Sequence, residues 1–241
     1  MIKRWGTCLT KEGVDPDEFW KYHTQIHPPD VMKIGGSGMK RYVMSRVTEV
    51  KSGEPRFYDL TEIWWENEEA VNRYYETTGT TRLPDGKLFS EGFASWITDN
   101  SSFIVEQFVA KDITTKVAAD MQTVNMIKRC ATCYPKEGID PEEFWKYHTQ
   151  VHAPHILKAS SPELKKYIVT RVVKLMKGTE PKFYDFVELW WDKEEEMNKD
   201  YETWKNAKLP DGKSLMEDFD SWITSASSFM MEEFIAREYR P

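Results

Sequence analysis

The sequence repeats itself across most of its 241 residues. Met-Ile-Lys-Arg at 1–4 returns at 126–129, and the motifs that follow return in the same order. Such a repeat means that one structural unit occurs twice, so the fold must accommodate two similar units. The segment between the copies has no twin and few large apolar residues. We assign the chain to a first half (1–111), a linker (112–125) and a second half (126–241).

Each copy predicts the same order of secondary structure. Asp15 caps the first helix and Pro16 fits its first turn, whereas Pro28 and Pro29 are expected to end it. In the first copy we expect strands at 2–9, 40–51, 57–65 and 103–110, helices at 16–27 and 67–76, and a short helical piece at 93–97.

This order, βαββαβ, is that of a ferredoxin-like unit, whose helices cover one face of a four-stranded sheet. Residues 167–173 are largely apolar on both alternations, so both faces of this strand are expected to be buried. The simplest solution packs the two sheets against each other. We therefore predict an α+β fold in which two tandem ferredoxin-like (βαββαβ) units form an intramolecular pseudo-dimeric α+β barrel with its helices outside.

Four of the five histidines lie in the two copies of Phe-Trp-Lys-Tyr-His-Thr-Gln and the residues just after them. At about 100° per helical residue, His23 lies in the middle of an apolar face, and His27 lies nearer its edge. His148 and His152 repeat this placement. We expect His23 and His148 to point between helix and sheet, where imidazole suits acid–base chemistry.

Two other interpretations of these histidines remain open. A buried histidine is often a core residue whose hydrogen bonds are satisfied. Zinc is the second alternative, but Thr24 and Thr149 stand where the zincin pattern needs glutamate. Two histidines also fall short of the three protein ligands of catalytic zinc. We therefore expect no metal.

Glutamates in the third expected strand of each copy have a structural interpretation. If the hairpin is centred near Glu54, Arg46 lies across from Glu62, and Arg171 lies across from Glu188 in the second copy. Opposite charges at such positions form cross-strand ion pairs. We interpret both glutamates as structural rather than catalytic.

Cys130 and Cys133 have the spacing of a redox or zinc motif but lie in an expected strand. Residues three apart on a strand point to opposite faces and lie roughly 10 Å apart. A disulfide needs Cα atoms within about 7 Å. We expect both to be small core residues.

The composition argues against two classes of partner, nucleic acids and membranes. The net charge is −7 and the isoelectric point is near 5.4, whereas a nucleic-acid partner asks for a basic face. No apolar run approaches the ~18 residues of a membrane span, and the first residues lack the apolar stretch of a secretion signal. We expect a cytoplasmic protein with no nucleic-acid or membrane partner.

The ordered motifs resemble a known family. The pattern Phe-Trp-x-Tyr-His-x-x-x-His, then Tyr-Val/Ile-x-x-Arg-Val, then Phe-Tyr-Asp-x-x-Glu-x-Trp-Trp is similar to EthD-type domains of the dimeric α+β barrel superfamily. The resemblance is carried by residues 19–28, 40–47 and 57–65 and again by 144–154, 166–172 and 183–191.

The resemblance implies a barrel of two sheets with one pocket per half. It also implies a proton-moving role for His23 and His148, with His27 and His152 beside them. Because His155 brings the second half closer to the family pattern, we favour that half as the working site. The expected substrate-binding residues are Tyr22, Tyr42, Trp64, Tyr147, His155, Tyr167 and Trp190.

The function that we expect from this resemblance is a cofactor-independent lyase or cyclase. It would dehydrate, decarboxylate or cyclise an aromatic or polyketide-like small molecule. A haem- or oxygen-dependent monooxygenase is one alternative, and a non-catalytic small-molecule-binding protein is another. We expect a single-chain pseudo-dimer that is a monomer or a weak homo-oligomer.

Overall fold

The computed structural model describes residues 1–83, 86–114, 126–178, 180 and 182–237. Its long strands close into one antiparallel barrel in the order β1-β3-β2-β8-β5-β7-β6-β4. Every strand expected in the first copy is present. The bounds are β1 Ile2–Thr10, β2 Met39–Ser52, β3 Asp59–Trp65, β4 Ile97–Asp112, β5 Ile127–Pro135, β6 Lys166–Lys177, β7 Asp185–Trp191 and β8 Ile223–Arg237.

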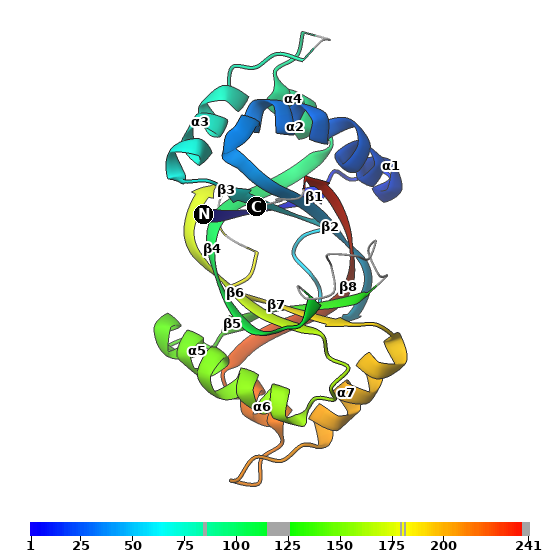
Figure 1. Cartoon of the computed structure of the whole chain (residues 1–241), viewed down its shortest axis with the longest axis vertical. Helices are drawn as coiled ribbons and strands as arrows, with labels where there is room; N and C mark the ends of the chain where they lie inside the picture. Colours follow the sequence, from blue (N-terminus) through cyan, green and yellow to red (C-terminus); the bar gives the residue numbers. More distant parts are fainter. Residues whose placement is uncertain (84–85, 115–125, 179, 181, 238–241) are drawn as a thin grey trace.

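The helices form two layers at opposite ends of the molecule, with the barrel between them (Figure 1). The first half contributes α1 Pro16–Lys21, α2 His27–Gly35, α3 Glu68–Thr78 and α4 Phe89–Ala94. The second half contributes α5 Pro141–Tyr147, α6 Ala153–Ala159, α7 Glu194–Asn206 and α8 Leu215–Asp220. The short helical piece expected at 93–97 begins and ends earlier, as α4. Most of the expected linker, residues 115–125, lies outside the described residues.

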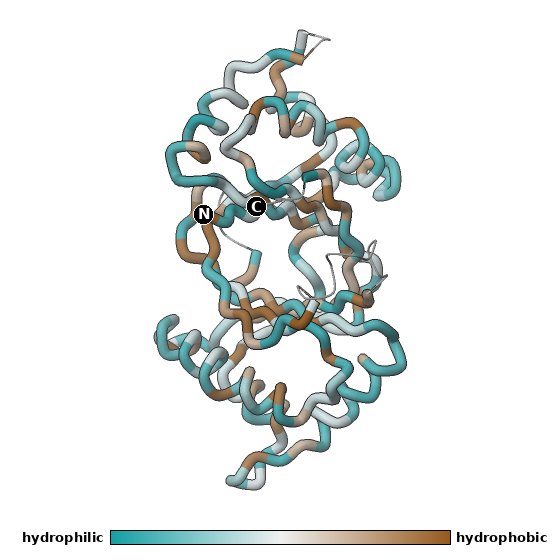
Figure 2. The backbone as a smooth tube through the Cα atoms, viewed as in Figure 1, coloured by the Kyte–Doolittle hydropathy of each residue, from teal (hydrophilic) through white to brown (hydrophobic). Residues whose placement is uncertain are grey.

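Two strand pairs join the halves into the barrel. β2 pairs with β8, and β4 pairs with β6, both antiparallel. Inside, Trp5 meets Phe186 edge to face at 5.1 Å between ring centroids, so the two halves share one apolar core. Figure 2 shows apolar residues gathered on the strands and polar residues on the outward turns of the helices. The closed α+β barrel expected from the two-sided apolar strand is confirmed.

The alternation along β3 decides which side chains can take part in a site under the helices. Thr61 and Ile63 line a cavity on the helix side of the sheet. Leu60 packs with the aromatic core inside the barrel, and Glu62 lies on the same alternation. Successive side chains of a strand point to opposite faces. Residues 60, 62 and 64 are therefore turned away from the helices.

The predicted ion pairs of these glutamates are wrong. Arg46 lies opposite Asp59, and Val43 lies opposite Glu62. The register differs from our expectation by three residues because β2 continues to Ser52 and residues 53–58 leave the ladder. An odd shift moves a side chain to the other face of the sheet.

The same correction holds in the second half, where Arg171 lies opposite Asp185. Arg171 bonds Glu106 and Glu142 instead. Glu188 lies 2.8 Å from Lys128 inside the barrel. Glu62 and Glu188 thus pair with lysines rather than with the arginines that we expected.

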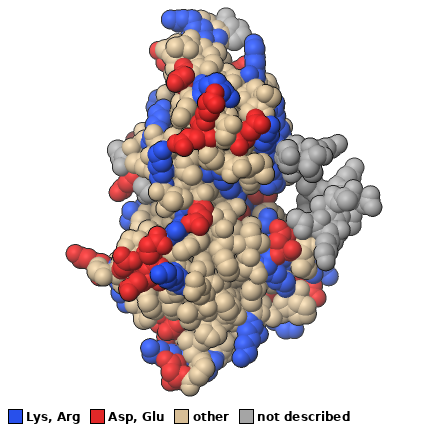
Figure 3. Space-filling view, turned by 60° about the vertical axis from the view of Figure 1, so that its left-hand side comes forward, with Lys and Arg blue, Asp and Glu red and all other residues tan. Residues whose placement is uncertain are grey.

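The outer surface carries both signs of charge. Figure 3 shows acidic and basic side chains interspersed on one face of the molecule, without a single patch of one sign. Among the described residues, no helix has the length and apolar character needed to cross a membrane.

Candidate active site

The helix that carries the histidines does not end where the prolines predict. α1 continues into a π-helical turn, Tyr22–Ile26, and then into α2. In this turn the N–H of His27 bonds to the carbonyl of Tyr22, five residues back. Pro28 then falls in the first turn of α2, where a missing N–H costs little. The second half repeats this arrangement.

The wider π turn also corrects the position of His27. In a regular helix it would lie near the edge of the buried face, but its ring centroid is 5.6 Å from that of His23. It is stacked between Phe89 at 4.9 Å and Phe93 at 4.8 Å. Burial, with His23 nearby, holds the pKa of His27 well below its usual value. His27 is therefore neutral near pH 7.

Each half contains a buried histidine–aspartate pair. Nδ1 of His23 lies 3.0 Å from Oδ2 of Asp59, and Nδ1 of His148 lies 2.7 Å from Oδ2 of Asp185. An ionised carboxylate only accepts hydrogen bonds, so it favours the tautomer with the proton on Nδ1. Nε2 is then the nitrogen that is left to accept a proton from a ligand.

A cavity of about 130 Å³ adjoins the pair of the first half. His23 and His27 line it from the helix, and Tyr42, Thr61 and Ile63 line it from the sheet. Other lining side chains come from α3, α4 and β4, so the cavity lies between the helices and the sheet. This is the position that we expected for the pocket, but in the half that we did not favour.

Three further ionisable groups of the cavity, Cys8, Tyr42 and Tyr74, stay protonated near pH 7. Burial, followed by the nearby Asp59, raises the pKa of the Cys8 thiol well above its ordinary value. The thiolate is the reactive form of cysteine, so Cys8 is not a nucleophile here. Burial also raises the pKa of Tyr42, and it raises that of Tyr74 to about 12. Both hydroxyls can donate a hydrogen bond to a ligand.

A polar group that our sequence analysis missed completes the cavity. Nε of Arg4 donates to the hydroxyl of Tyr75 at 2.9 Å and to that of Ser102 at 2.6 Å. All three side chains line the cavity. Arg4 was not predicted because its strand gives it no motif, and its partners lie 71 and 98 residues away.

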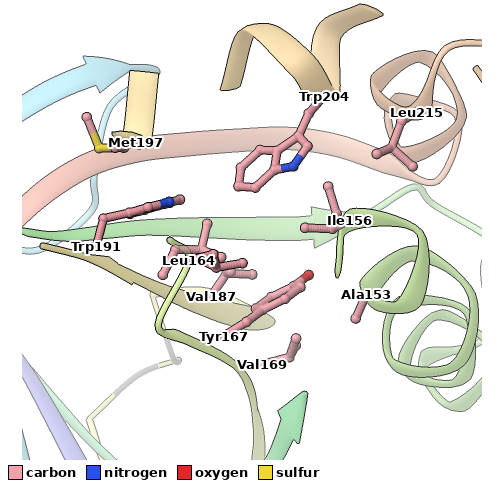
Figure 4. Close-up of a cluster of buried hydrophobic side chains, with 11 residues drawn as sticks. Ala153, Ile156, Leu164, Tyr167, Val169, Val187, Trp191, Met197, Trp204 and Leu215 are labelled. Atoms are coloured by element: carbon pink, nitrogen blue, oxygen red, sulfur yellow. The ribbon is translucent and has the colours of Figure 1, made fainter. Parts of the chain in front are cut away.

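In the second half, larger apolar side chains occupy the corresponding region. Trp204 stands where the repeat has Thr78, and Met216 stands where it has Ser90. Trp204 is 2% exposed and belongs to a tightly packed apolar cluster. Figure 4 shows Trp204, Ile156 and Leu215 of the helices directed toward strand residues of this cluster. Larger side chains thus stand where the first half has residues that line the cavity.

The second histidine–aspartate pair also differs in its hydrogen bonding. The hydroxyl of Thr61 donates weakly to Asp59 Oδ1 at 3.5 Å. Val187 occupies the equivalent place, and Oδ1 of Asp185 is buried with no hydrogen-bond partner among the described residues. Burial raises the pKa of Asp185. Fewer hydrogen bonds therefore hold the carboxylate of Asp185 in place to orient His148.

The predicted site residues fall into three groups. His23, His27 and Tyr42 line the cavity. A second group does not line the cavity. Its members belong to or lie near the His148–Asp185 pair of the second half, or stack on a tryptophan beside a histidine-bearing helix. This group comprises His148, His152, His155, Tyr167, Tyr147 on Trp222, and Tyr22 on Trp96.

The third group is Trp64 and Trp190, which lie away from the cavity. Nζ of Lys3 lies 4.0 Å from the ring centroid of Trp64, and Nζ of Lys128 lies 4.9 Å from that of Trp190. Both tryptophans thus belong to a charged cluster inside the barrel, because their strand positions alternate away from the helices.

Asp59 and Asp185 are further candidate site residues that sequence analysis overlooked. We considered the glutamates of the same motif, Phe-Tyr-Asp-x-x-Glu, but not the aspartates as histidine partners. The alternation along β3 could have identified them, since position 59 shares its face with Thr61 and Ile63.

Several solved structures have this fold and match nearly the full chain. A protein of Lactobacillus acidophilus NCFM, provisionally described as a monooxygenase, is 16% identical, with 98% of this chain and 96% of that chain covered and a TM-score of 0.50. An anthrone oxidase-like protein is 12% identical, with 99% and 94% covered and a TM-score of 0.55. A protein of Fusobacterium nucleatum subsp. nucleatum ATCC 25586, also provisionally described as a monooxygenase, is 9% identical, with 100% and 95% covered and a TM-score of 0.54.

No curated protein matches the chain by sequence. The EthD domain model matches residues 136–223, which include the helix, the π turn and the histidine pair of the second half. The repeat gives the first half the same motifs in the same order. Residues 136–223 of the second half thus match the EthD domain, and the whole chain has the fold of these solved structures.

Proposed function

We propose that the chain is an oxygen-dependent monooxygenase that acts on a small aromatic or polyketide-like compound, with His23 as its base. The observation that carries this proposal is the His23–Asp59 pair beside a cavity lined by aromatic rings. A histidine whose Nδ1 is held by a carboxylate can use Nε2 to remove a proton from a ring carbon or hydroxyl.

The lyase or cyclase that we expected from sequence is wrong. The solved structures reported above, which match nearly the whole chain, are described as monooxygenases or as anthrone oxidase-like. These descriptions favour the oxygen-dependent alternative. The proton-removing role that we assigned to His23 fits that alternative equally well.

The reaction balances without an added reductant if the substrate carries an activated ring methylene. His23 takes one proton from this carbon, and the carbanion, delocalised into the ring, gives its electrons to O₂. One oxygen atom becomes the new carbonyl oxygen, and the other leaves as water with the two hydrogens of the methylene. Tyr42 or Tyr74 can donate a hydrogen bond to the developing negative charge.

Haem, the other part of this alternative, does not fit the cavity. The volume of the cavity is about 130 Å³, whereas a cavity of about 150 Å³ holds a single benzene ring. His27 is stacked between two phenylalanine rings, which occupy the space beside its imidazole. Haem is therefore no part of the proposed reaction.

The matched pair His23→Gln and His148→Gln tests the proposal. With one-ring compounds that carry an activated ring methylene as substrates, oxygen uptake by His23→Gln should fall by about 10²- to 10⁴-fold, the usual contribution of a general base. His148→Gln should retain most of the activity. Incorporation of ¹⁸O from labelled O₂ identifies the product oxygen.

Equal loss in both variants would move the site out of the first half. No oxygen uptake with any of these compounds, by a wild-type protein that is folded, would reject the monooxygenase. Near-ultraviolet circular dichroism of each variant separates a lost base from a lost fold.

We also infer that the two halves are ferredoxin-like units. The strand order β4-β1-β3-β2 of the first half recurs as β8-β5-β7-β6 in the second, which supports the inference. The matching positions of the helices and π turns support it further.

A further inference from the structure

The charge of the cavity lining runs against that of the chain. The sequence has 40 acidic and 33 basic residues. Yet the lining contains two positively charged side chains, Arg4 and Lys177, and no aspartate or glutamate among the described residues. A neutral ligand gives no reason for such an excess of positive charge.

Arg4 has no carboxylate partner within the described part of the chain. Its Nε is bonded to the hydroxyls of Tyr75 and Ser102, which carry no formal charge. Nη2 of Arg4 lies against Gly6. A Cβ added to Gly6 would lie 3.3 Å from this nitrogen. Charges removed from water are normally paired. The planar fork of arginine matches a carboxylate through two parallel hydrogen bonds.

Lys177 comes from the other half of the molecule. It lies at the end of β6, opposite Ser102 of β4. The exposed side chain forms no ion pair with a described residue. The equivalent position in the first half, opposite Ser228, is Ser52, so this cation is not a product of the repeat.

Gly178 and Glu180, which follow Lys177, lie close to β4. Gly178 has φ +98, and a Cβ there would lie 2.6 Å from the carbonyl oxygen of Asn100. The hydroxyl of Ser101 donates to the carbonyl of Glu180 at 2.6 Å. Only glycine tolerates both the conformation and the contact. The second half therefore holds a cation at the mouth of a cavity in the first half.

We propose that the cavity binds an aromatic carboxylate, with Arg4 as the principal contact and Lys177 at the mouth. The volume of about 130 Å³ is close to that of a cavity of about 150 Å³ that binds benzene, which limits the ligand to about one ring. The inference rests on the proposed function, and it narrows the substrate to a ring compound that bears a carboxylate. His23 and Arg4 then contact the same ligand.

The repeat provides a matched control for Arg4. Its twin Arg129 bonds Ser228 at 2.9 Å, and its guanidinium carbon lies 3.4 Å from the ring centroid of Tyr201. Trp204 fills the neighbouring space. Arg129 thus keeps the same local hydrogen bond without facing the described cavity.

The experiment measures binding of salicylate and of its neutral analogue salicylamide to the full chain by isothermal titration calorimetry. We expect salicylate to bind at least about tenfold more tightly, because a charge-assisted pair replaces a neutral one. Arg4→Gln should remove this preference, and Lys177→Ala should reduce it by a smaller factor. Arg129→Gln should leave it within about twofold, as a charge that does not face the ligand contributes little.

Several results would overturn the inference. These are equal affinity for the two probes in the wild type, equal effects of Arg4→Gln and Arg129→Gln, or no binding of either probe at millimolar concentration. If Arg4→Gln does not fold, the wild-type comparison and the exposed Lys177→Ala still decide. Oxygen uptake is measured separately. Carboxylate-selective binding without oxygen uptake would reject the monooxygenase alone, and uptake with neutral substrates only would reject the carboxylate alone.

Discussion

Asp59 has a role at the residue scale that its position makes testable. It bonds Nδ1 of His23 and does not line the cavity, so it orients the base without touching the ligand. An asparagine can donate to Nδ1 and thereby stabilise the wrong tautomer.

We therefore expect Asp59→Asn to lower kcat by about 10²- to 10⁴-fold. KM should change little, and the acid limb of the pH–rate profile should shift. Asp185→Asn is the matched control and should leave the rate near that of the wild type. A KM effect alone for Asp59→Asn would contradict the positioning role.

His27 and His152, the second histidine of each copy, predict a dependence of stability on pH. Burial is the main cause that lowers the pKa values of His27 and His152 well below the ordinary one. In the unfolded chain they bind protons near pH 6.5. Between the two pKa values the unfolded state binds more protons, so the free energy of unfolding rises with pH there.

We expect the urea midpoint to fall as the pH is lowered from 7.5 to about 5.5, because these histidines begin to protonate in the unfolded chain. The double variant His27→Gln/His152→Gln should show a weaker dependence. The raised pKa of Asp185 acts in the opposite direction toward the acid end of this range. An unchanged pH slope in the double variant would show that other groups control it.

At the scale of elements, helices α3 and α7 decide which half contains the space. Thr78 of α3 lines the cavity, and Trp204 of α7 fills the equivalent region. The two helices share their strand contacts and their place in the repeat. The halves differ here in side-chain volume, and α7 also continues to Asn206, whereas α3 ends at Thr78.

Thr78→Trp should abolish ligand binding, because the indole occupies the cavity. Thr77→Trp, at the adjacent exposed position of the same helix, is the control and should bind normally. Calorimetric binding of salicylate or oxygen uptake measures the difference. Retained binding in Thr78→Trp would mean that the ligand uses another space.

Trp204→Thr should instead destabilise the protein by about 3–5 kcal/mol, the usual cost of truncating a buried tryptophan. Urea denaturation measures the change. A loss below about 1 kcal/mol, close to the effect of an ordinary surface substitution, would show that the second half tolerates a cavity.

At the scale of the whole molecule, buried charges connect the halves inside the barrel. Nζ of Lys128 lies 2.8 Å from Glu188 and 2.7 Å from Glu233 in its own half, and 3.8 Å from Glu62 in the other. Its side chain is 1% exposed. The three carboxylates depend on this cation and on Lys3, which lies 2.9 Å from Glu62.

Lys128→Met should lower the free energy of unfolding by about 3–5 kcal/mol, because removing one partner leaves uncompensated buried charge. Lys174→Met is the control, since its pair with Glu68 is exposed and such pairs contribute about 0–1 kcal/mol. Equal effects of the two substitutions in urea denaturation would rule out a structural role for the cluster.

The halves should not be stable apart. A separated half would expose the aromatic interior and leave β2 and β4, or β6 and β8, without their partners. Unpaired strand edges and apolar surface favour aggregation. We expect fragments 1–114 and 126–241 to be unfolded or aggregated alone and to form a 1:1 complex when expressed together. Size-exclusion chromatography and circular dichroism check this outcome.

Local chemistry determined much of this molecule. The repeat, the alternation of strands and the Asp-Pro start of the histidine helix predicted the elements, because these signals act within a few residues. Two-sided apolar strands predicted the barrel, because both faces of such a strand must be buried. The family resemblance then directed attention to His23 and His148, whose carboxylate partners lie 36 and 37 residues away.

Tertiary structure decided the rest. The hairpin register depended on how many residues left the ladder, and the fate of the helix at Pro28 depended on a π turn that no periodicity encodes. The location of the cavity followed from the summed volumes of side chains on several elements, among them Thr78 against Trp204. The unpaired charge of Arg4 became visible only when residues 71 and 98 positions away were brought to it. Sequence fixes which groups a chain has, whereas packing over long separations decides which of them face empty space.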